Sequence, residues 1–428
     1  MAPPTVDLVY FNAGGGHRAA AQALRDTIAL QGRPWEVRLV NLFEVLDPNG
    51  SFRKLTGVAP EDLYNKRLAK GWTLGLRQEL KLLQGMIRLG HASLVKTLQA
   101  HWAATAPDLV VSLVPNFNRA MFEALAAARP GVPYVTVLTD MADHPPHFWI
   151  EPGHQPQGLR HIVCGTARAR DQALAAGHAP DRVSLVSGMI LRPAFHKVAP
   201  LSSDDRAAAL HAMGLDATQP TGLVMFGGQG SAQMATIAKA LADRQLILMC
   251  GHNEALAQRL RRQRPLAAHA VLGFTPDVGR LMRLGDYFIG KPGPGALSEA
   301  VQMGLPVITT LNAWTMPQER YNAQWVREHG LGLVLPSLRG VAAGVAELLS
   351  RLADFRAAAA RVDNRAVFEV VDLLARWLPA QGGGAGASSP SIGLASASCA
   401  RAGAGLPSLS SPPPPGLGVD GAAVLAAK

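Results

Sequence analysis

Glycine-rich turns recur in this chain, and each one precedes an expected helix, whose N-terminal backbone amides attract anions. Residues 227–230 read Gly-Gly-Gln-Gly and are followed by Ser231. Residues 293–295 read Gly-Pro-Gly, and residues 14–16 are all glycine. The turn at 227–230 suits a diphosphate. It lacks the Gly-Lys-Ser/Thr end of a Walker A loop, so ATP hydrolysis is not indicated.

The stretch 290–318 contains an expected glycine turn, a helix and a strand, and an apolar run precedes it. Together these segments have the ~30 residues of a βαβ unit. We expect the helix from about residue 296 to 303. Glu299 then stands in its first turn, where a carboxylate suits a sugar hydroxyl. The alternative is that Gly293 and Gly295 only form a tight turn and that Glu299 is solvated.

His17 follows the glycines at 14–16, and three interpretations are open. A GxGxxA pattern begins at residue 14 and passes as a dinucleotide fingerprint, but the next strand ends at Asn41, where an NAD site usually has an acid. His17 is alternatively a helix cap or a satisfied surface group. In the third interpretation, its position at a helix N-terminus in a cleft lowers its pKa, so the neutral ring deprotonates an acceptor hydroxyl.

Asp140 follows an expected strand at 134–138, and ligands bind beyond the carboxyl ends of such strands. It is placed to orient His17 or to balance its charge. The segment 144–149, His-Pro-Pro-His-Phe-Trp, is expected to line an acceptor pocket, although these are also ordinary loop residues. We expect no metal at its two histidines, because no second ligand cluster accompanies them.

Apolar runs alternate with helical patterns, which predicts parallel sheets with helices on both faces. Gly273 and Phe274 directly follow one such run and are suited to placing backbone groups against a base. We therefore predict an α/β fold of two doubly wound domains that face a central cleft holding the active site. The runs lie at 6–11, 36–40, 108–113, 134–138, 162–164 and 183–185, and then at 222–226, 245–249, 270–272, 287–289 and 307–310.

A Pro/Ser/Asp-rich passage near residue 195 separates the two series of strands. The predicted domains are therefore 1–195 and 196–364. A helix at 365–380 is expected to cross between the domains. The tail at 381–428 consists largely of Gly, Ala, Ser and Pro and is predicted to be disordered.

The chain of 428 residues has a net charge of +10, which favours anionic partners such as acidic lipid headgroups, phosphorylated substrates or nucleic acid. Segment 66–102 concentrates this charge, with Glu79 as its single acid and leucines between its basic residues. It predicts a basic amphipathic helix on an anionic membrane surface. The alternative is a core helix with a solvated basic face. The three cysteines are far apart, which fits a reducing cytoplasm.

Taken together, these motifs resemble the glycosyltransferases of GT-B fold grouped with monogalactosyldiacylglycerol synthase and the peptidoglycan enzyme MurG. The resemblance covers about residues 5–378. The motifs that carry it are Gly-Gly-Gly-His-Arg-Ala-Ala at 14–20, Thr-Val-Leu-Thr-Asp at 136–140, Gly-Gly-Gln-Gly-Ser at 227–231, Gly-Phe-Thr-Pro-Asp-Val at 273–278, Gly-Lys-Pro-Gly-Pro-Gly-Ala-Leu-Ser-Glu-Ala at 290–300 and Pro-Gln-Glu at 317–319. Pro292 and the tail depart from the pattern of the family.

The resemblance implies transfer of galactose or glucose from UDP-galactose or UDP-glucose to diacylglycerol or a similar lipid, with inversion. The first domain then binds the acceptor and the membrane, and the second binds the UDP-sugar. No tightly bound cofactor, metal or nucleic acid is implied. The resemblance implies that His17 is the general base and that Asp140 is its neighbour or a second acidic group. It further implies diphosphate contacts for Gly228, Gly230 and Ser231, a backbone contact of Phe274 with the uracil, ribose contact for Glu299 and donor-sugar contacts for Gln318 and Glu319.

Other functions remain open from the sequence. MurG-like transfer to another lipid-linked acceptor uses the same motifs, and a nucleotide-sugar epimerase uses the same fold. A non-catalytic membrane scaffold that keeps the nucleotide site is a further alternative. Segment 66–102 favours a lipid acceptor over a soluble epimerase substrate, and His17 with Asp140 favours an enzyme over a scaffold. The expected location is the cytoplasmic face of a membrane, as a peripheral protein.

Overall fold

The structure, a computed structural model, describes residues 2–12, 15–50, 54, 76–152 and 160–378, which fall within one compact unit ending at residue 383. The predicted tail at 381–428 lies outside the described residues, so its disorder stays a prediction, as do the predicted domain boundaries. Twelve strands are described: β1 Thr5–Tyr10, β2 Glu36–Asn41, β3 Leu109–Ser112, β4 Tyr134–Val137, β5 Arg160–Cys164, β6 Val183–Leu185, β7 Thr221–Met225, β8 Gln245–Met249, β9 His269–Leu272, β10 Tyr287–Ile289, β11 Val307–Thr310 and β12 Gly332–Leu335.

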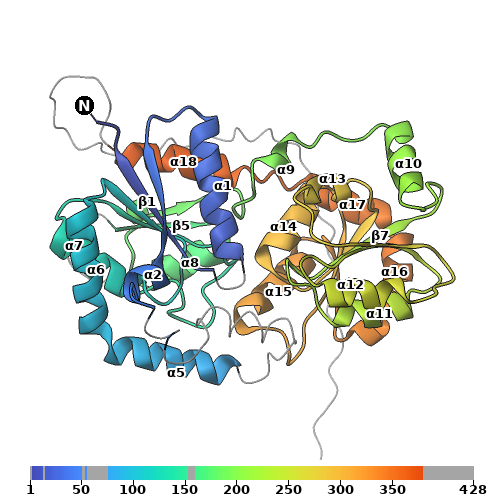
Figure 1. Ribbon diagram of the computed structural model, residues 1–428, viewed down its shortest axis with the longest axis horizontal. Coiled ribbons are helices and arrows are strands. Elements are labelled where there is room, and N and C mark those ends of the chain that lie inside the picture. The colour runs from blue at the N-terminus through green and yellow to red at the C-terminus, as the bar shows by residue number, and fades with distance from the viewer. Residues whose placement is uncertain (1, 13–14, 51–53, 55–75, 153–159, 379–428) are drawn as a thin grey trace, which may run out of the picture. The chain divides into compact units, whose positions relative to one another are not determined.

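The strands form two parallel six-stranded sheets, in the orders β2-β1-β3-β4-β5-β6 and β12-β11-β10-β7-β8-β9. Both orders reverse direction beside a central strand, as in doubly wound folds, and ligands bind at such reversals. The register pairs Val6 with Leu109 and with Val37 across β1. Figure 1 shows helices alternating with these strands. The predicted doubly wound α/β architecture is confirmed.

Each sheet has a hydrophobic core on both faces, which follows from the two-residue period of a strand. In β1, Leu8 packs in one core, while its neighbour Val9 packs in the core on the other face. In β7, Leu223 and Val224 divide between two cores in the same way. Strands buried on both faces are apolar throughout, and this is why the strands were readable as continuous apolar runs.

Helices connect the strands and cover both faces of each sheet. Those of the first half are α1 Gly16–Leu30, α2 Leu42–Leu46, α5 Leu76–Leu89, α6 His91–Thr105, α7 Asn118–Ala128, α8 Ala167–Ala175, η1 Pro180–Arg182, α9 Ala194–Lys197 and α10 Ser203–Ala212. Those of the second half are α11 Gln233–Ala240, α12 Glu254–Arg261, α13 Val278–Met282, α14 Pro294–Gln302, η2 Pro317–Glu319, α15 Arg320–Glu328, η3 Leu338–Gly340, α16 Val341–Ser350, α17 Leu352–Ala360 and α18 Ala366–Trp377.

Helix α18 returns from the second sheet to the first. Its buried residues Val367 and Val371 share a core with Leu8 of β1 and Leu24 of α1. The α18 ribbon, drawn in orange-red, lies beside α1 in Figure 1. The amphipathic pattern of α18 is therefore used to cover one face of the first sheet, although the helix follows the second sheet in sequence.

Three local expectations were wrong. Helix α14 begins at Pro294, two residues earlier than expected, because proline suits the first position of a helix. Segment 66–102 is not one helix: Gly90 separates α5 from α6 within its described part. The edge strand β12 was missed, since its four residues are only half-buried and give no strong apolar run.

Candidate active site

His17 lies in the first turn of α1, beyond the carboxyl end of β1. Gly15 caps this helix with a φ of 78°, a left-handed conformation that glycine adopts freely. Gly14 lies outside the described residues. The His17 ring places Nδ1 3.0 Å from the Thr139 hydroxyl oxygen, which comes from the end of β4. The imidazole is thus held between residues that follow β1 and β4, two strands separated by β3 in the sheet.

Burial lowers the pKa of His17 to about 4, with a hydrogen bond to the Leu113 carbonyl partly opposing the shift. The ring is therefore neutral at physiological pH and has one nitrogen free of a proton. In the tautomer in which Nδ1 carries the proton and donates it to the Thr139 hydroxyl, the opposite nitrogen Nε2 is suited to accept a proton from a bound hydroxyl. This is the protonation state that a general base requires.

Asp140 is 7% exposed, and the contact of its carboxylate is with Trp149. The Trp149 indole nitrogen donates to its Oδ2 at 2.8 Å. The same indole lies 5.8 Å from the imidazole of His17, measured between ring centroids. The sequence suggested that Asp140 orients His17 or balances its charge, and in the structure Trp149 contacts both residues.

The pKa of Asp140 is raised to about 7, first of all by burial. The hydrogen bond from Trp149 lowers it, the Glu319 carboxylate raises it further, and Lys291 lowers it. A buried carboxylate is costly to ionise unless hydrogen bonds or cations compensate it. Asp140 therefore changes charge close to neutral pH, and residues that follow the second sheet influence this change.

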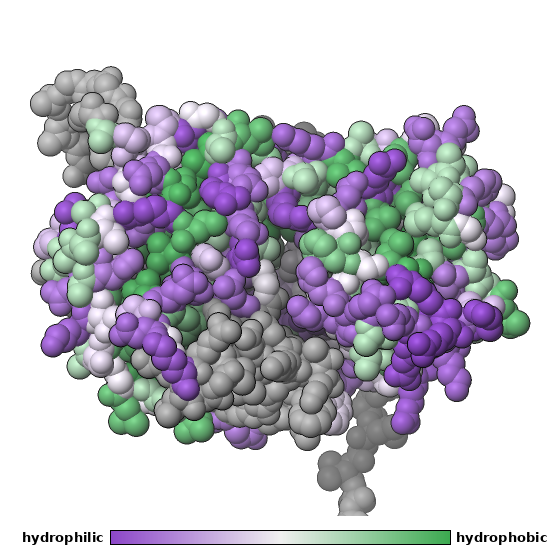
Figure 2. All heavy atoms as spheres, viewed as in Figure 1, coloured by the Kyte–Doolittle hydropathy of each residue, from purple (hydrophilic) through white to green (hydrophobic). Residues whose placement is uncertain are grey.

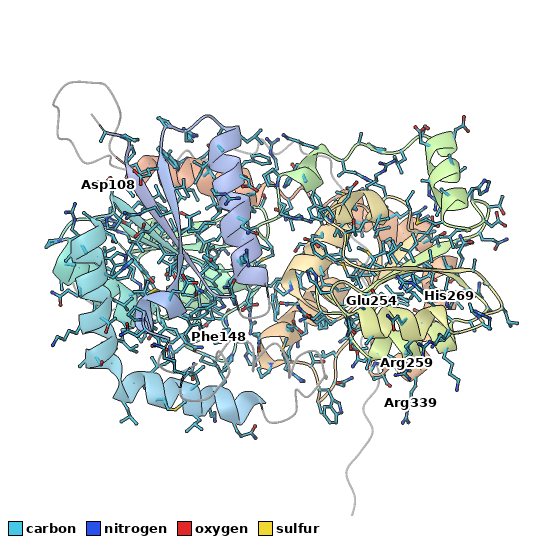
Figure 3. All side chains as sticks on the ribbon, in the orientation of Figure 1. Asp108, Phe148, Glu254, Arg259, His269 and Arg339 are labelled. Atoms are coloured by element: carbon cyan, nitrogen blue, oxygen red, sulfur yellow. The ribbon has the colours of Figure 1, made fainter. Side chains whose placement is uncertain are left out.

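The loop that carries Trp149 is organised by Asp143. Its carboxylate accepts hydrogen bonds from the backbone amides of Trp149 at 2.6 Å and His147 at 2.9 Å. The Gln172 side chain donates to the Asp143 carbonyl at 2.8 Å. Figure 3 labels the neighbouring Phe148 in this loop, and Asp108 at the opposite, amino end of β3. Asp143 thus fixes the loop that brings Trp149 to Asp140.

The first glycine turn of the second sheet follows β7 and precedes α11. Gly227 and Gly230 have φ values of 78° and 59°. Gly228 is exposed, and its carbonyl accepts the His252 amide at 2.8 Å. The hydroxyl oxygen of Ser231 accepts the Gln233 amide at 3.3 Å at the start of α11. The turn therefore presents an exposed backbone next to a helix N-terminus, as a phosphate site requires.

Phe274 follows β9 and is 62% exposed. Its ring stacks on the His252 ring with centroids 4.1 Å apart and an interplanar angle of 16°. His252 also bonds to the Gly228 carbonyl through its backbone, so it joins Phe274 to the glycine turn. Sequence reasoning missed His252, because only the fold brings the ends of β8 and β9 together.

Gly293 is buried and caps α14, whereas Gly295 is exposed in its first turn. Because α14 begins at Pro294, Glu299 lies in the second turn of the helix rather than in the first. Burial raises the pKa of Glu299 to about 7, and Arg192 opposes the shift. Glu299 is thus a second carboxylate whose charge changes close to neutral pH.

Glu319 is 5% exposed and forms an ion pair with Lys291, whose Nζ lies 2.8 Å from its Oε1. We call these two residues the Lys291–Glu319 ion pair. Gln318 is half-buried beside it, with its amide nitrogen 3.8 Å from the Met316 sulfur. The ion pair influences the pKa of Asp140, so it lies within electrostatic range of that carboxylate.

The structure thus gathers the candidate residues in groups. His17, Thr139, Trp149 and Asp140 form one, while Glu319 and Lys291 act electrostatically on Asp140. The contacts of the described residues do not join Phe274 or Glu299 to His17. Within the same residues, no cluster of three or more His, Cys, Asp or Glu side chains is arranged to hold a metal ion. The predicted absence of a metal stays a prediction.

Helix α5 presents exposed apolar side chains outside this site. Leu82, Met86 and Leu89 are 65%, 53% and 91% exposed, and their spacing places them on one helix face. We call these three residues the α5 stripe. Figure 2 shows hydrophobic residues, in green, at the lower left edge, where Figure 1 places α5. Ile87, on another face of α5, packs against the core.

The predicted membrane segment 66–102 is only partly described, since residues 66–75 lie outside the described range. Helix α6 contributes Leu98 and Trp102 to the core, so its apolar residues are not a membrane surface. No helix in the described part of the chain has the length and apolar composition needed to cross a bilayer.

Comparison with known proteins gives a family match in the second half of the chain. Residues 223–376 match the glycosyltransferase family 28 C-terminal domain. A probable monogalactosyldiacylglycerol synthase 2 of Oryza sativa subsp. japonica is 27% identical over 377 residues, which cover 81% of this chain and 73% of the rice protein. Monogalactosyldiacylglycerol synthase 1 of Arabidopsis thaliana is 26% identical over 378 residues, covering 81% of this chain and 64% of the plant protein. Both relatives are described as chloroplastic.

Solved structures show the fold. MurG of Acinetobacter baumannii superposes with a TM-score of 0.53 at 13% identity, covering 87% of this chain and 99% of MurG. The UDP-GlcNAc 2-epimerase of Neisseria meningitidis, bound to UDP-GlcNAc, gives 0.52 at 12% identity, again covering 87% of this chain and 99% of the epimerase. At such identities the likeness establishes the GT-B fold alone.

These comparisons confirm the resemblance drawn from the motifs and support a glycosyltransferase. The family match covers the sheet that carries both the 227–230 turn and the Lys291–Glu319 ion pair, and the relatives align across both sheets. Residues 223–376 therefore match the glycosyltransferase family 28 C-terminal domain, and the chain resembles the monogalactosyldiacylglycerol synthases over most of its length.

Proposed function

We propose that this protein transfers a hexose, galactose or glucose, from a UDP-sugar to the hydroxyl of diacylglycerol, with inversion at the anomeric carbon. The observation that carries the proposal is the neutral His17, held by Thr139 beyond the first sheet. The relatives named as monogalactosyldiacylglycerol synthases support the donor and the acceptor. The exposed α5 stripe supports a lipid acceptor, because a soluble acceptor requires no apolar surface.

In the proposed reaction, His17 Nε2 takes the proton of the acceptor hydroxyl while the oxygen attacks the anomeric carbon. The bond from the anomeric carbon to the diphosphate oxygen breaks, and UDP leaves with the electron pair. His17 then carries a positive charge. Asp140, in its ionised form, offsets this charge across the Trp149 indole, whose N–H donates a hydrogen bond to Asp140 Oδ2 at 2.8 Å.

The donor half of the proposed site follows the second sheet. Gly228, Gly230 and Ser231 contact the diphosphate through the turn before α11, aided by the N-terminus of α14 at Gly293 and Gly295. The further donor contacts are the backbone of Phe274 for the uracil, Glu299 for the ribose hydroxyls, and Gln318 with Glu319 for the hexose. No metal or tightly bound cofactor enters this proposal, and the helix N-termini contribute partial positive charge towards the leaving diphosphate.

The α5 stripe docks the protein on a membrane in this proposal. A bilayer holds diacylglycerol, so an enzyme that uses it must reach the interface. Lys81 and Arg88 are exposed on the same helix and favour anionic headgroups. The relatives are named as chloroplast proteins, so they do not support the predicted cytoplasmic face, and the compartment of this chain stays a prediction.

The direct test is incubation with labelled UDP-galactose or UDP-glucose and liposomes that contain diacylglycerol. We expect label in the extracted lipid with one of the two donors, and a reversed anomeric configuration in the product by NMR. No lipid-linked label with either donor would contradict the proposal. The same assay with other lipid-linked acceptors tests the MurG-like alternative.

A UDP-sugar epimerase is the second candidate, favoured by the likeness to the UDP-GlcNAc 2-epimerase fold. It requires no lipid, and its product stays in the aqueous phase. Incubation with UDP-GlcNAc, followed by analysis of the nucleotide sugars, distinguishes the two functions. We expect no epimerised product, and its appearance without lipid would favour the second candidate.

A further inference from the structure

Lys291 forms an ion pair with Glu319 at the start of α14. Its ammonium donates to Glu319 Oε1 at 2.8 Å, and its side chain is 35% exposed while that of Glu319 is 7% exposed. Among the contacts of the described residues, Glu319 is the partner of Nζ. An ammonium has three donors. Two of them are therefore available to a ligand.

The Lys291–Glu319 ion pair lies against the start of α14. A Cβ built on Gly293 would lie 3.4 Å from Lys291 Cε and 3.6 Å from Glu319 Oε1. Gly293 is the residue that caps this helix, so the ammonium is close to the end at which an anion is favoured. The position combines a full positive charge with the partial charge of a helix N-terminus.

The backbone around Lys291 is fixed on both sides. The Asn322 side chain donates to the Pro292 carbonyl at 2.8 Å, and the Thr309 hydroxyl donates to the Gly290 carbonyl at 2.9 Å. Asn322 and Thr309 are both fully buried. These hydrogen bonds hold the backbone of Lys291 in place. Its ammonium group therefore moves only through rotation of the side chain.

The N-terminus of α14 has fewer free backbone amides for binding an anion than the N-terminus of an ordinary helix. Its first residue is Pro294, which has no N–H, and the Gly293 amide already bonds to the Lys291 carbonyl at 2.8 Å. A diphosphate at this helix end therefore needs positive charge from another source. Lys291 is a cation that lies at this helix end.

We propose that Lys291 is a further catalytic residue, which moves from Glu319 to the diphosphate of the donor and neutralises it as UDP leaves. This inference rests on the proposed function. As the bond between the anomeric carbon and the diphosphate oxygen breaks, the electron pair stays on that oxygen, and the ammonium donates a hydrogen bond to it. Glu319 is thereby released to accept a hydroxyl of the hexose.

The test compares the binding of UDP and uridine by calorimetry, which needs neither acceptor nor membrane. Lys291→Met is expected to weaken UDP binding about 10- to 100-fold, the value of a charge-assisted hydrogen bond, and to leave uridine binding unchanged. Lys291→Arg keeps the charge and should retain most of the UDP affinity. Lys239→Met is the matched control, because Lys239 is an exposed lysine on α11 of the same half.

Two results would overturn the inference. One is equal binding of UDP by Lys291→Met and the unmodified protein. The other is an equal loss of UDP and uridine affinity, which indicates that Lys291 only maintains the site. If Lys291→Met does not fold, the comparison of Lys291→Arg with Lys291→Gln gives the same test. Failure of the unmodified protein to bind UDP would instead contradict the proposed function.

Discussion

At the scale of single residues, the candidate site depends on two ionisable groups whose burial shifts them in opposite senses. Burial lowers the pKa of His17 to about 4 and raises that of Asp140 to about 7. The lowered pKa keeps His17 neutral. The raised pKa leaves Asp140 as a mixture of its ionised and protonated forms near neutral pH. Pairs of groups with separated pKa values are typical of acid–base chemistry.

The rate of transfer should therefore depend on pH through Asp140. The ionised carboxylate offsets the charge that forms on His17, and it is lost as pH falls through about 7, so kcat should fall in the same range. His17 stays neutral as the pH falls to about 4, so its protonation does not change kcat near pH 7. In Asp140→Asn the inflection near pH 7 should disappear. Glu299 also changes charge near pH 7, so the Glu299→Gln variant is the control for Asp140→Asn. The pH profile of Glu299→Gln should retain the inflection near pH 7. An unchanged profile in Asp140→Asn would contradict this role.

Trp149 is predicted to act through its indole nitrogen. Trp149→Phe keeps an aromatic ring beside His17 but removes the donor to Asp140, whose pKa should then rise further. We expect a loss of about 10-fold in kcat, the value of one hydrogen bond to a charged group. The inflection in the pH profile should move to higher pH. Trp35→Phe, at the amino end of β2, is the control. An unmoved inflection in Trp149→Phe would show that the indole nitrogen does not influence Asp140.

At the scale of elements, the turn between β7 and α11 depends on glycine at position 230. Gly230 has a φ of 59°, and a Cβ there would lie 2.8 Å from the Cys250 carbonyl oxygen. The turn therefore requires glycine for both conformation and space.

Gly230→Ala should lower the free energy of unfolding by about 2–4 kcal/mol, combining left-handed strain of about 1–2 kcal/mol with the steric clash. Gly131→Ala is the matched control, because Gly131 also has a positive φ, of 87°, but open space around it. We expect the control to lose only the strain energy, as measured by urea unfolding. Equal losses in the two variants would contradict the packing argument, and unchanged UDP binding in Gly230→Ala would contradict the role of the turn.

The α5 stripe makes a separate prediction at this scale. Replacing Leu82, Met86 and Leu89 by serine should abolish sedimentation with liposomes that contain anionic lipid and diacylglycerol, because each buried leucine side chain contributes about 1.5–3 kcal/mol. Binding of UDP should not change, since the stripe is separate from the donor turns. Serine at Leu174 and Leu185, two other exposed leucines, is the control. Full sedimentation of the triple variant would exclude the α5 stripe as the membrane contact.

At the scale of the whole molecule, the architecture was readable from the sequence because buried parallel strands are continuously apolar. All six strands of the first sheet and five of the second coincide with expected runs. Edge strand β12 escaped because it is half-buried. The break at Gly90 escaped because leucines and basic residues continue across it, and glycine interrupts a helical pattern only weakly.

Contacts within the candidate site were less accessible to sequence reasoning. The turns holding His17 and Gly228 were found from local patterns, as was the position of Asp140 after a strand. Their partners were not. His17 and Thr139 are separated by 122 residues, and Lys291 and Glu319 by 28, so only the folded chain brings each pair together. Trp149 was expected in an acceptor pocket, but its bond to Asp140 depends on the path of the loop.

The central claim, that His17 is the base of a hexosyl transfer to lipid, is tested most directly with His17→Ala. Labelled hexose reaching diacylglycerol liposomes is measured alongside UDP binding by calorimetry, with His211→Ala, an exposed histidine of α10, as control. The account predicts at least about a 100-fold loss of lipid-linked label with UDP affinity unchanged, as expected for a lost general base. Transfer at the unmodified rate by His17→Ala would contradict it.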